Sequence, residues 1–378
     1  MVNENLSRRR LLGGALAGFT GALLAACAPT VRRGESGGGE LPAVSGRGPM
    51  RRPPGAGMQG PPLPPGRPVP ALRAGARVAI VAPASATPGA ADTAAAWLQE
   101  RGLEAVIMPA ATMRMQAPFD YLAGPDEARL RDLHEAFAAP DIGAVWCLQG
   151  GFGSWRLLDG IDYALLRQHP KPFIGYSDIT ALHLAIQRHA GLVTFHGPMP
   201  GQDFVAGRSD PTERSLWRMV SGELRPGDTL APSPQPFLTP LLPGRASGRL
   251  TGGNLALIAA LIGSAYEIDT RDAILFIEDT NEALPRIDRL LAQLRAAGKF
   301  EGLRGVVAGQ FTRSGRGATE ALGPRVHTLL QSYFYGLGIP VLADWPSGHG
   351  DPNLTLPLGA VVTLDTAQGL TLGQAVTV

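Results

Sequence analysis

The chain has 378 residues, of which 44% are hydrophobic and 17% are charged. This is the composition of a globular protein, and the length suffices for one large or two medium domains. The net charge of +2 conceals an asymmetry, because residues 1–77 carry 11 Arg and 3 Glu and residues 78–378 a net charge of −6. The mildly acidic body argues against a nucleic-acid-binding protein, which needs a basic face.

Residues 1–27 are predicted to be an export signal. Three arginines, Arg8–Arg10, precede an apolar run from Leu11 to Ala26 that is too short and too rich in Gly and Ala for a membrane span. The arginines resemble a twin-arginine signal, and the sequence LAAC ending at Cys27 resembles a bacterial lipobox. We expect export by the twin-arginine route and lipidation of Cys27, giving a periplasmic or otherwise extracytoplasmic lipoprotein anchored to the membrane. An ordinary signal peptide containing a chance cysteine is the alternative.

Residues 28–70 are predicted to form a disordered tether. Residues 42–70 contain 10 Pro and 6 Gly and almost no apolar side chains that a core could bury. The arginines of this segment either contact anionic lipid or wall polymer, or belong to a simple soluble spacer.

Order is predicted to begin near Leu72, and residues 71–224 alternate strands with helices. Apolar strand-like runs are followed by amphipathic helical stretches, in this chain order: strand 76–85, helix 92–102, strand 103–109, helix 124–140, a strand, glycine loop and helix within 142–161, and the same plan within 171–191. This alternation indicates a mostly parallel sheet with helices on both faces.

Residues 225–247 are interrupted by six prolines and are predicted to be an interdomain linker. Residues 248–378 resume the alternation and end in a stretch, 353–373, whose period of two and glycine turns indicate antiparallel hairpins. The expected fold is therefore α/β: an N-terminal domain with a mostly parallel sheet, and a C-terminal mixed α/β domain. Ligands in such folds bind at the carboxyl ends of strands.

Ser177 stands where a strand meets a helix in the stretch PKPFIGYSDITALHLAI. The local pattern alone favours a helix cap, and it does not match the G-x-S-x-G nucleophile elbow. A serine on such a turn can also project its oxygen into the crevice while the amide of Asp178 points to the same place, which pairs a nucleophile with an oxyanion donor. Both interpretations stay open from these residues alone.

A nucleophilic serine needs a base and a group that orients the base. Among the seven histidines, His349 lies in a Gly- and Pro-flanked loop just after a strand, where packing does not require histidine, and His196 is a weaker candidate. Glu278 and Asp279 end the apolar strand AILFIED. Ser177, Glu278 and His349 thus all lie at or after the ends of predicted strands.

Two further features carry little chemistry by themselves. The glycine loop LQGGFGSW at 148–155 matches no phosphate-binding motif, but its glycines allow close backbone approach and a second oxyanion amide. Cys147 is predicted to be a buried hydrophobic residue, and no disulfide framework, metal cluster or cofactor motif is found in the sequence.

Taken together, the stretches RVAIVAPAS, GGFGSWRLLDGIDY, PKPFIGYSDITALHLAI, LFIEDTNEALPRIDRLLAQL and GHGDPNLTLPLG, in this order, resemble the LD-carboxypeptidases. This family of serine peptidases includes muramoyltetrapeptide carboxypeptidase and the microcin C immunity peptidase. The resemblance covers about residues 72–375. It departs from the family at Gln149, where Arg is frequent, and at Phe152, where Tyr is frequent.

The resemblance implies a catalytic triad of Ser177 as nucleophile, His349 as base and Glu278 as its carboxylate partner. It further implies oxyanion donors at the backbone amides of Gly151 and Asp178, an active site at the interface of the two domains and, since dimers are common in the family, a homodimer.

The implied function is hydrolysis of the L,D-peptide bond to the terminal D-alanine of peptidoglycan tetrapeptides. The export signal favours cell-wall remodelling over cytoplasmic recycling. An immunity-type hydrolase of peptidyl or aminoacyl nucleotide conjugates and a non-catalytic wall-binding lipoprotein are the alternatives.

Overall fold

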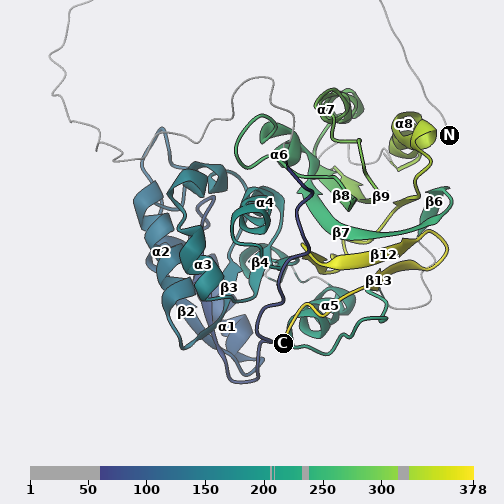
Figure 1. Ribbon diagram of the computed structural model, residues 1–378. Coiled ribbons are helices and arrows are strands. Elements are labelled where there is room, and N and C mark those ends of the chain that lie inside the picture. The colour runs from purple at the N-terminus through teal and green to yellow at the C-terminus, as the bar shows by residue number, and fades with distance from the viewer. Residues whose placement is uncertain (1–59, 205–206, 208, 232–237, 314–322) are drawn as a thin grey trace, which may run out of the picture. The chain divides into compact units, whose positions relative to one another are not determined.

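Short apolar segments form two sheets in the computed structural model, which describes residues 60–204, 207, 209–231, 238–313 and 323–378 (Figure 1). All of these residues belong to one unit of the chain. The predicted export signal, Cys27 and residues 28–59 of the predicted tether lie outside the described residues.

The first sheet has six strands in the order β11-β5-β4-β3-β1-β2. Its strands are β1 (Arg77–Val81), β2 (Glu104–Ile107), β3 (Ile142–Cys147), β4 (Phe173–Gly175), β5 (Thr194–His196) and β11 (Leu356–Leu358). Neighbouring strands from β2 to β5 pair in parallel, and β11 pairs antiparallel with β5 at the edge. The mostly parallel sheet predicted from the alternation is thus confirmed, and the nearly continuous burial of β1 and β3 is that of strands covered on both faces.

The second sheet has seven strands in the order β13-β12-β7-β8-β9-β10-β6. Its strands are β6 (Thr239–Leu242), β7 (Arg245–Asn254), β8 (Ala273–Thr280), β9 (Gly305–Thr312), β10 (Val341–Ala343), β12 (Val361–Asp365) and β13 (Gly369–Leu372). The strands β7 to β10 are parallel, whereas β6, β12 and β13 join antiparallel. The pair β12–β13 confirms the antiparallel hairpin predicted near the C-terminus.

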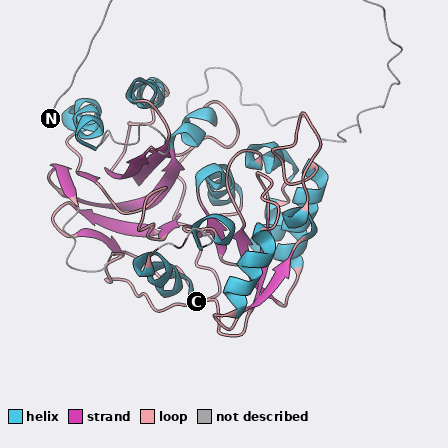
Figure 2. Ribbon diagram, turned by 180° about the vertical axis from the view of Figure 1, so that it is seen from behind, coloured by secondary structure: helices cyan, strands magenta, loops and turns pink. Residues whose placement is uncertain are grey.

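Amphipathic segments form the helices, which flank the strands in both views (Figures 1 and 2). They are α1 (Ala90–Gln99), α2 (Asp126–Ala138), α3 (Tyr163–Gln168), α4 (Thr180–His189), α5 (Asp210–Val220), α6 (Leu255–Ala260), α7 (Leu284–Ala296) and α8 (Gly323–Phe334), with shorter turns η1 (Pro109–Thr112), η2 (Ser154–Gly160), η3 (Ser177–Ile179), η4 (Pro200–Phe204) and η5 (Tyr335–Leu337). In α7, for example, Ile287, Leu291 and Leu294 are buried at helical spacing. No helix in the described part of the chain combines the length and the apolarity needed to span a membrane.

Three details differ from the predicted domain boundaries. Strand β6 lies inside 225–247, the range predicted as a linker, and belongs to the second sheet. Strand β11, from the range 248–378, joins the first sheet rather than the second. Residues 60–70 were predicted to belong to the disordered tether, but backbone hydrogen bonds hold them to the fold: the amide of Gly66 donates to Gly359 and that of Val69 to Val376, over 2.8 and 3.1 Å.

The two sheets are joined next to the turn that carries Ser177. Helix α4, which begins at Thr180, packs on β7 of the second sheet. The Thr180 hydroxyl accepts a hydrogen bond of 3.0 Å from the amide of Asn254, where β7 ends. A side chain on Gly253 would collide with Thr180, its Cβ lying 2.5 Å from Oγ1, so glycine there permits this approach.

Candidate active site

Ser177 follows β4 on a sharp turn into η3 and α4. Its φ of 63° lies in the left-handed region, which costs a non-glycine residue about 1–2 kcal/mol and must be held by the surrounding structure. The side chain caps neither η3 nor α4, whose N-cap residues are Tyr176 and Ile179. The hydroxyl instead contacts a histidine, so of the two interpretations of Ser177 the cap does not apply.

His349 lies in the loop between β10 and β11, where the chain leaves the second sheet and enters the first. This crossing places its imidazole between the two sheets. The Nε2 atom of His349 lies 3.0 Å from the Ser177 hydroxyl oxygen, within hydrogen-bond distance. The predicted nucleophile and the predicted base are therefore in contact, although they are far apart in the chain.

Glu278, near the end of β8, lies on the other side of the imidazole. Its Oε2 atom is 2.7 Å from Nδ1 of His349, and the Glu278 side chain is fully buried. A carboxylate only accepts hydrogen bonds, so Nδ1 carries the proton and Nε2 of the neutral ring presents its lone pair to Ser177. The structure thus brings Ser177, His349 and Glu278 together in the order that a serine nucleophile, its base and an orienting carboxylate require.

The charge state of His349 depends on this partner. Burial opposes charging of the ring, but the charge and hydrogen bond of Glu278, helped by the charges of Asp279 and Asp203, outweigh it and raise the pKa of His349 above its ordinary value. The site therefore stabilises the charged, imidazolium form of His349.

Asp279, the neighbour of Glu278, points away from the histidine, as successive residues of a strand do. Its carboxylate accepts from the Asn254 side chain and from the Ala256 amide, both at 3.0 Å, and so holds the start of α6. Burial, together with the nearby charge of Glu278, raises the pKa of Asp279 to about 6. Of the two carboxylates at this strand end, only Glu278 contacts His349.

The glycine loop after β3 meets the Ser177 turn at Gly150. A methyl group on Gly150 would lie 2.9 Å from Cβ of Ser177 and 3.3 Å from the amide nitrogen of Asp178. The close backbone approach expected of this loop is therefore present. Gly151 follows with a φ of 95° and turns against Ser85. The oxyanion role of the Gly151 and Asp178 amides stays a prediction.

Tyr176 and Asp203 support the site, and sequence reasoning did not identify them. The Tyr176 ring is fully buried, and its centroid lies 5.0 Å from that of His349 at an angle of 62°. Its hydroxyl donates to Asp203 over 3.0 Å. Tyr176 could have been identified from its position directly before Ser177, whereas nothing in the sequence around Asp203, in η4, pointed to the site.

Gln310 holds the loop that carries His349. Its Oε1 accepts from the amide of Gly350 at 2.8 Å, and its Nε2 donates to the carbonyl of Pro352 at 3.2 Å.

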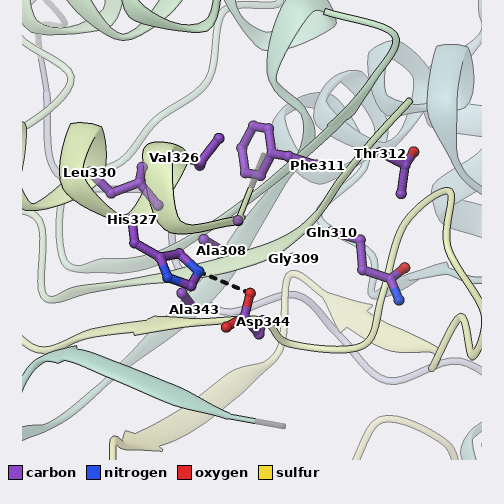
Figure 3. A pocket seen from close by; sticks show the side chains of 11 residues that line it. Ala308, Gly309, Gln310, Phe311, Thr312, Val326, His327, Leu330, Ala343 and Asp344 are labelled. Carbon is purple, nitrogen blue, oxygen red and sulfur yellow. Dashed lines mark hydrogen bonds and ion pairs between the residues drawn. The ribbon is translucent and has the colours of Figure 1, made fainter. Parts of the chain in front are cut away.

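Gln310 also lines a cavity of about 210 Å³ between α8 and the ends of β9 and β10, with a hydrogen-bonded pair, His327 and Asp344, at the opposite end (Figure 3). Neither Ser177 nor His349 lines this cavity.

The remaining candidates do not join the triad. His196 is buried in β5 behind Tyr176, with ring centroids 5.7 Å apart, and burial lowers its pKa well below the ordinary value. Cys147 is buried in β3, as predicted. Among the described residues, no group of three or more His, Cys, Asp or Glu side chains is arranged to hold a metal ion.

Comparisons with known proteins identify similar sequences over most of the chain. The family model described as the LD-carboxypeptidase N-terminal domain matches residues 78–197, and the model of the corresponding C-terminal domain matches residues 247–364. A Bacillus subtilis protein named probable murein peptide carboxypeptidase is 40% identical over 299 residues, which are 79% of this chain and 91% of that protein.

Solved structures show the same fold. A muramoyltetrapeptide carboxypeptidase from Oxalobacter formigenes is 29% identical, with a TM-score of 0.65 over 80% of this chain and 100% of that one. The protein MccF, in complex with glutamyl sulfamoyl guanosine, has a TM-score of 0.72 over 82% of this chain and 99% of that one; at 24% identity it shows the fold alone. The chain belongs to the LD-carboxypeptidase family of serine peptidases.

Proposed function

We propose that the protein is a serine carboxypeptidase that hydrolyses the L,D-peptide bond to the terminal D-alanine of murein tetrapeptides. The observation that carries this proposal is the chain of hydrogen bonds from Ser177 through His349 to Glu278. The names of its relatives, which refer to murein peptide and muramoyltetrapeptide, support the substrate class.

In the proposed mechanism, Nε2 of His349 takes the proton of the Ser177 hydroxyl as its oxygen attacks the carbonyl carbon of the scissile bond. Glu278 holds the imidazole in place and stabilises its charged form. The tetrahedral intermediate collapses when the carbon–nitrogen bond breaks, and His349 gives its proton to the departing amine of D-alanine. Water, deprotonated by His349, then releases the acyl group from Ser177.

The negative oxygen of the intermediate needs donors that are already in position. We assign this role to the backbone amides of Gly151 and Asp178, which lie beside the two residues in contact, Gly150 and Ser177. Removing one such donor typically costs an enzyme about 10²- to 10³-fold in kcat.

We further propose that the protein acts on the cell wall after export by the twin-arginine route, anchored to the membrane through a lipid on Cys27. The sequence of residues 1–27 and the Pro- and Gly-rich segment after it support this location. Cell fractionation tests it: the Cys27→Ala variant should leave the membrane fraction. Recovery of the wild-type protein in the cytoplasmic fraction would contradict the proposal. A homodimer is the accompanying expectation, and sedimentation of the purified protein tests it.

The substrate is tested by incubating the purified full chain with a murein tetrapeptide ending in D-alanine and, separately, with an aminoacyl nucleotide conjugate. Mass spectrometry should detect D-alanine and the tripeptide from the first and little cleavage of the second. Preferential cleavage of the conjugate would establish the immunity-type hydrolase instead. Binding of the tetrapeptide without turnover would indicate the wall-binding lipoprotein.

A further inference from the structure

Three exposed aromatic side chains lie together at the glycine loop that follows β3. Phe119, Tyr121 and Phe152 are 38%, 41% and 47% exposed, although large apolar side chains are usually buried. The ring centroids of Phe119 and Tyr121 are 6.5 Å apart, and those of Tyr121 and Phe152 are 6.0 Å apart. We call these three residues the aromatic strip; contiguous exposed apolar side chains of this kind mark binding surfaces.

Backbone hydrogen bonds fix the aromatic strip relative to Ser177. Phe152 is two residues from Gly150, which touches Ser177, and its amide donates to the Ser85 hydroxyl at 3.0 Å. The Ser85 amide donates to the Gly150 carbonyl at 3.1 Å, and the next amide, that of Ala86, donates to the carbonyl of Tyr121 at 2.9 Å. These bonds join the segments that follow β1, β2 and β3 into one surface.

A buried arginine under the aromatic strip adds to this rigidity. Arg129 of α2 is 1% exposed, and its guanidinium donates to the carbonyls of Gly124, Pro83 and Gly153, which lie in the same three segments. The aromatic strip is therefore held in place before any ligand arrives, which lowers the entropic cost of binding.

The sheet order defines the direction in which the aromatic strip extends. Ser177 follows β4, and the three segments that carry and support the strip follow β3, β1 and β2, which lie successively further from β4. His349 precedes β11, at the opposite edge of this sheet. The aromatic strip and His349 thus lie on opposite sides of Ser177.

This arrangement determines the direction in which the substrate lies across Ser177. His349 must give its proton to the departing amine, so the leaving D-alanine lies on the His349 side and the acyl part extends to the other side. We propose that the aromatic strip binds the acyl-side peptide of the substrate, that is, the residues before the scissile bond. The inference rests on the proposed function. An extended peptide spans about 3.3–3.6 Å per residue, so the ring spacings of 6.0 and 6.5 Å each correspond to about two residues. The aromatic strip is therefore long enough for the three residues that precede D-alanine in a tetrapeptide.

The tilt of the rings suits a peptide rather than a flat base. Neighbouring rings are inclined by 64° and 56°, so they present alternating faces and edges. Such walls contact the side chains of an extended chain. A sandwiched nucleobase needs nearly parallel rings, such as those of Trp97 and Phe204, which are inclined by 11°.

The test compares two substrates of the full chain. One is the murein tetrapeptide, and the other is an N-acetylated dipeptide of the diamino acid and D-alanine, which keeps the scissile bond but lacks the two residues before the diamino acid. For the tetrapeptide, Tyr121→Ala and Phe152→Ala should each lower kcat/KM by about tenfold, mainly through KM. For the dipeptide, the change in Tyr121→Ala should stay within about twofold, since the residues that this ring contacts are absent, and Phe152→Ala should lose less than it does on the tetrapeptide. Tyr335→Ala is the matched control, because Tyr335 is 78% exposed on η5 and lies outside the aromatic strip.

Equal losses on both substrates, or no loss on either, would overturn the proposal. Binding of the tripeptide product to the Ser177→Ala variant, measured by calorimetry, separates this inference from the proposed function. If adding Tyr121→Ala to Ser177→Ala weakens this binding, the role of the aromatic strip is supported, even if the wild-type protein releases no D-alanine. The absence of D-alanine release would count against the proposed function alone. Unchanged binding would overturn the strip's role whatever the hydrolysis shows.

Discussion

The carboxylate of Glu278 lies 2.7 Å from Nδ1 of His349 and has no exposure to solvent. In the Glu278→Gln variant, a neutral amide replaces the charged carboxylate, so the imidazolium loses its counter-charge. We expect kcat for D-alanine release to fall by about 10³- to 10⁴-fold with little change in KM. A fall of less than tenfold, measured by steady-state kinetics, would remove Glu278 from the mechanism.

The same pair determines how activity depends on pH. The base must be neutral to accept a proton, so kcat/KM should fall as the pH drops through the pKa of His349, which is raised above 6.5. In Glu278→Gln the raising charge is gone while burial, which lowers the pKa, remains, so the acid limb of the pH profile should move to lower pH. Glu282→Gln is the control, since Glu282 pairs with Arg286 at 2.6 Å and not with His349. If the acid limb of the pH profile stays in place in Glu278→Gln, the raised pKa of His349 is not due to Glu278.

Gln310 is expected to act as a positioning residue. Gln310→Ala removes both hydrogen bonds that hold the loop at Gly350 and Pro352, so the imidazole loses its fixed position. We expect kcat to fall by about tenfold with KM within about twofold, because misplacement affects the reaction more than binding. Gln310→Glu keeps the acceptor for Gly350 and should recover part of the loss.

The matched control for Gln310→Ala is Gln293→Ala. The native Gln293 side chain donates to the carbonyl of Ala259 on α6. A change in KM equal to that in kcat in Gln310→Ala would indicate general damage to the fold instead of mispositioned chemistry.

Gly150 is expected to tolerate no side chain. In Gly150→Ala the new methyl would lie 2.9 Å from Cβ and 3.1 Å from Oγ of Ser177, so one of the two turns must shift. We expect kcat to fall by about 10²-fold or more, since small displacements of reacting groups have effects of this size. Gly336→Ala, at a glycine with no neighbour within 4 Å, should retain wild-type kinetics. Wild-type activity in Gly150→Ala would show that the loop does not constrain Ser177.

Arg129 is expected to stabilise the fold. Arg129→Met would leave the carbonyls of Pro83 and Gly124 without this donor, whereas that of Gly153 keeps the Arg156 amide, and each unsatisfied group costs about 1–3 kcal/mol. The free energy of unfolding, measured with urea, should therefore fall by about 3 kcal/mol or more. Arg131→Met, at an exposed position of the same helix, should change it by less than about 0.5 kcal/mol. Equal effects of the two substitutions would contradict this role.

The strand-and-helix alternation could be predicted from local patterns in the sequence, whereas the triad was implied by the resemblance to the LD-carboxypeptidases. Apolar runs followed by amphipathic stretches defined β4 and α4, and polar residues at strand ends pointed to Ser177 and Glu278. The predicted contact of these residues with His349 is present in the structure.

Features that depend on distant pairing could not be predicted. Strand β6 is short and contains Pro240, which reads as a break in a strand pattern, yet it lies at a sheet edge where proline is tolerated. Strand β11 lies within the predicted hairpin stretch, but its pairing with β5 of the first sheet was not predicted. The apolar residues within 60–70 show no regular spacing, and this segment is held in place by backbone hydrogen bonds to partners as distant as Val376. Gln310 and Asp203 act through hydrogen bonds with residues 27 to 42 positions away in the chain, for which one sequence holds no signal.

The most direct measurement of the central claim is D-alanine release from a murein tetrapeptide by the wild-type chain and by Ser177→Ala, followed by mass spectrometry. Ser332→Ala is the control, because Ser332 is an exposed serine of α8 whose hydroxyl donates to the carbonyl of Leu329 within its own helix. We expect release by the wild type and the control, and a loss of at least about 10³-fold in Ser177→Ala. Equal release by all three proteins would contradict the assignment of Ser177 as the nucleophile.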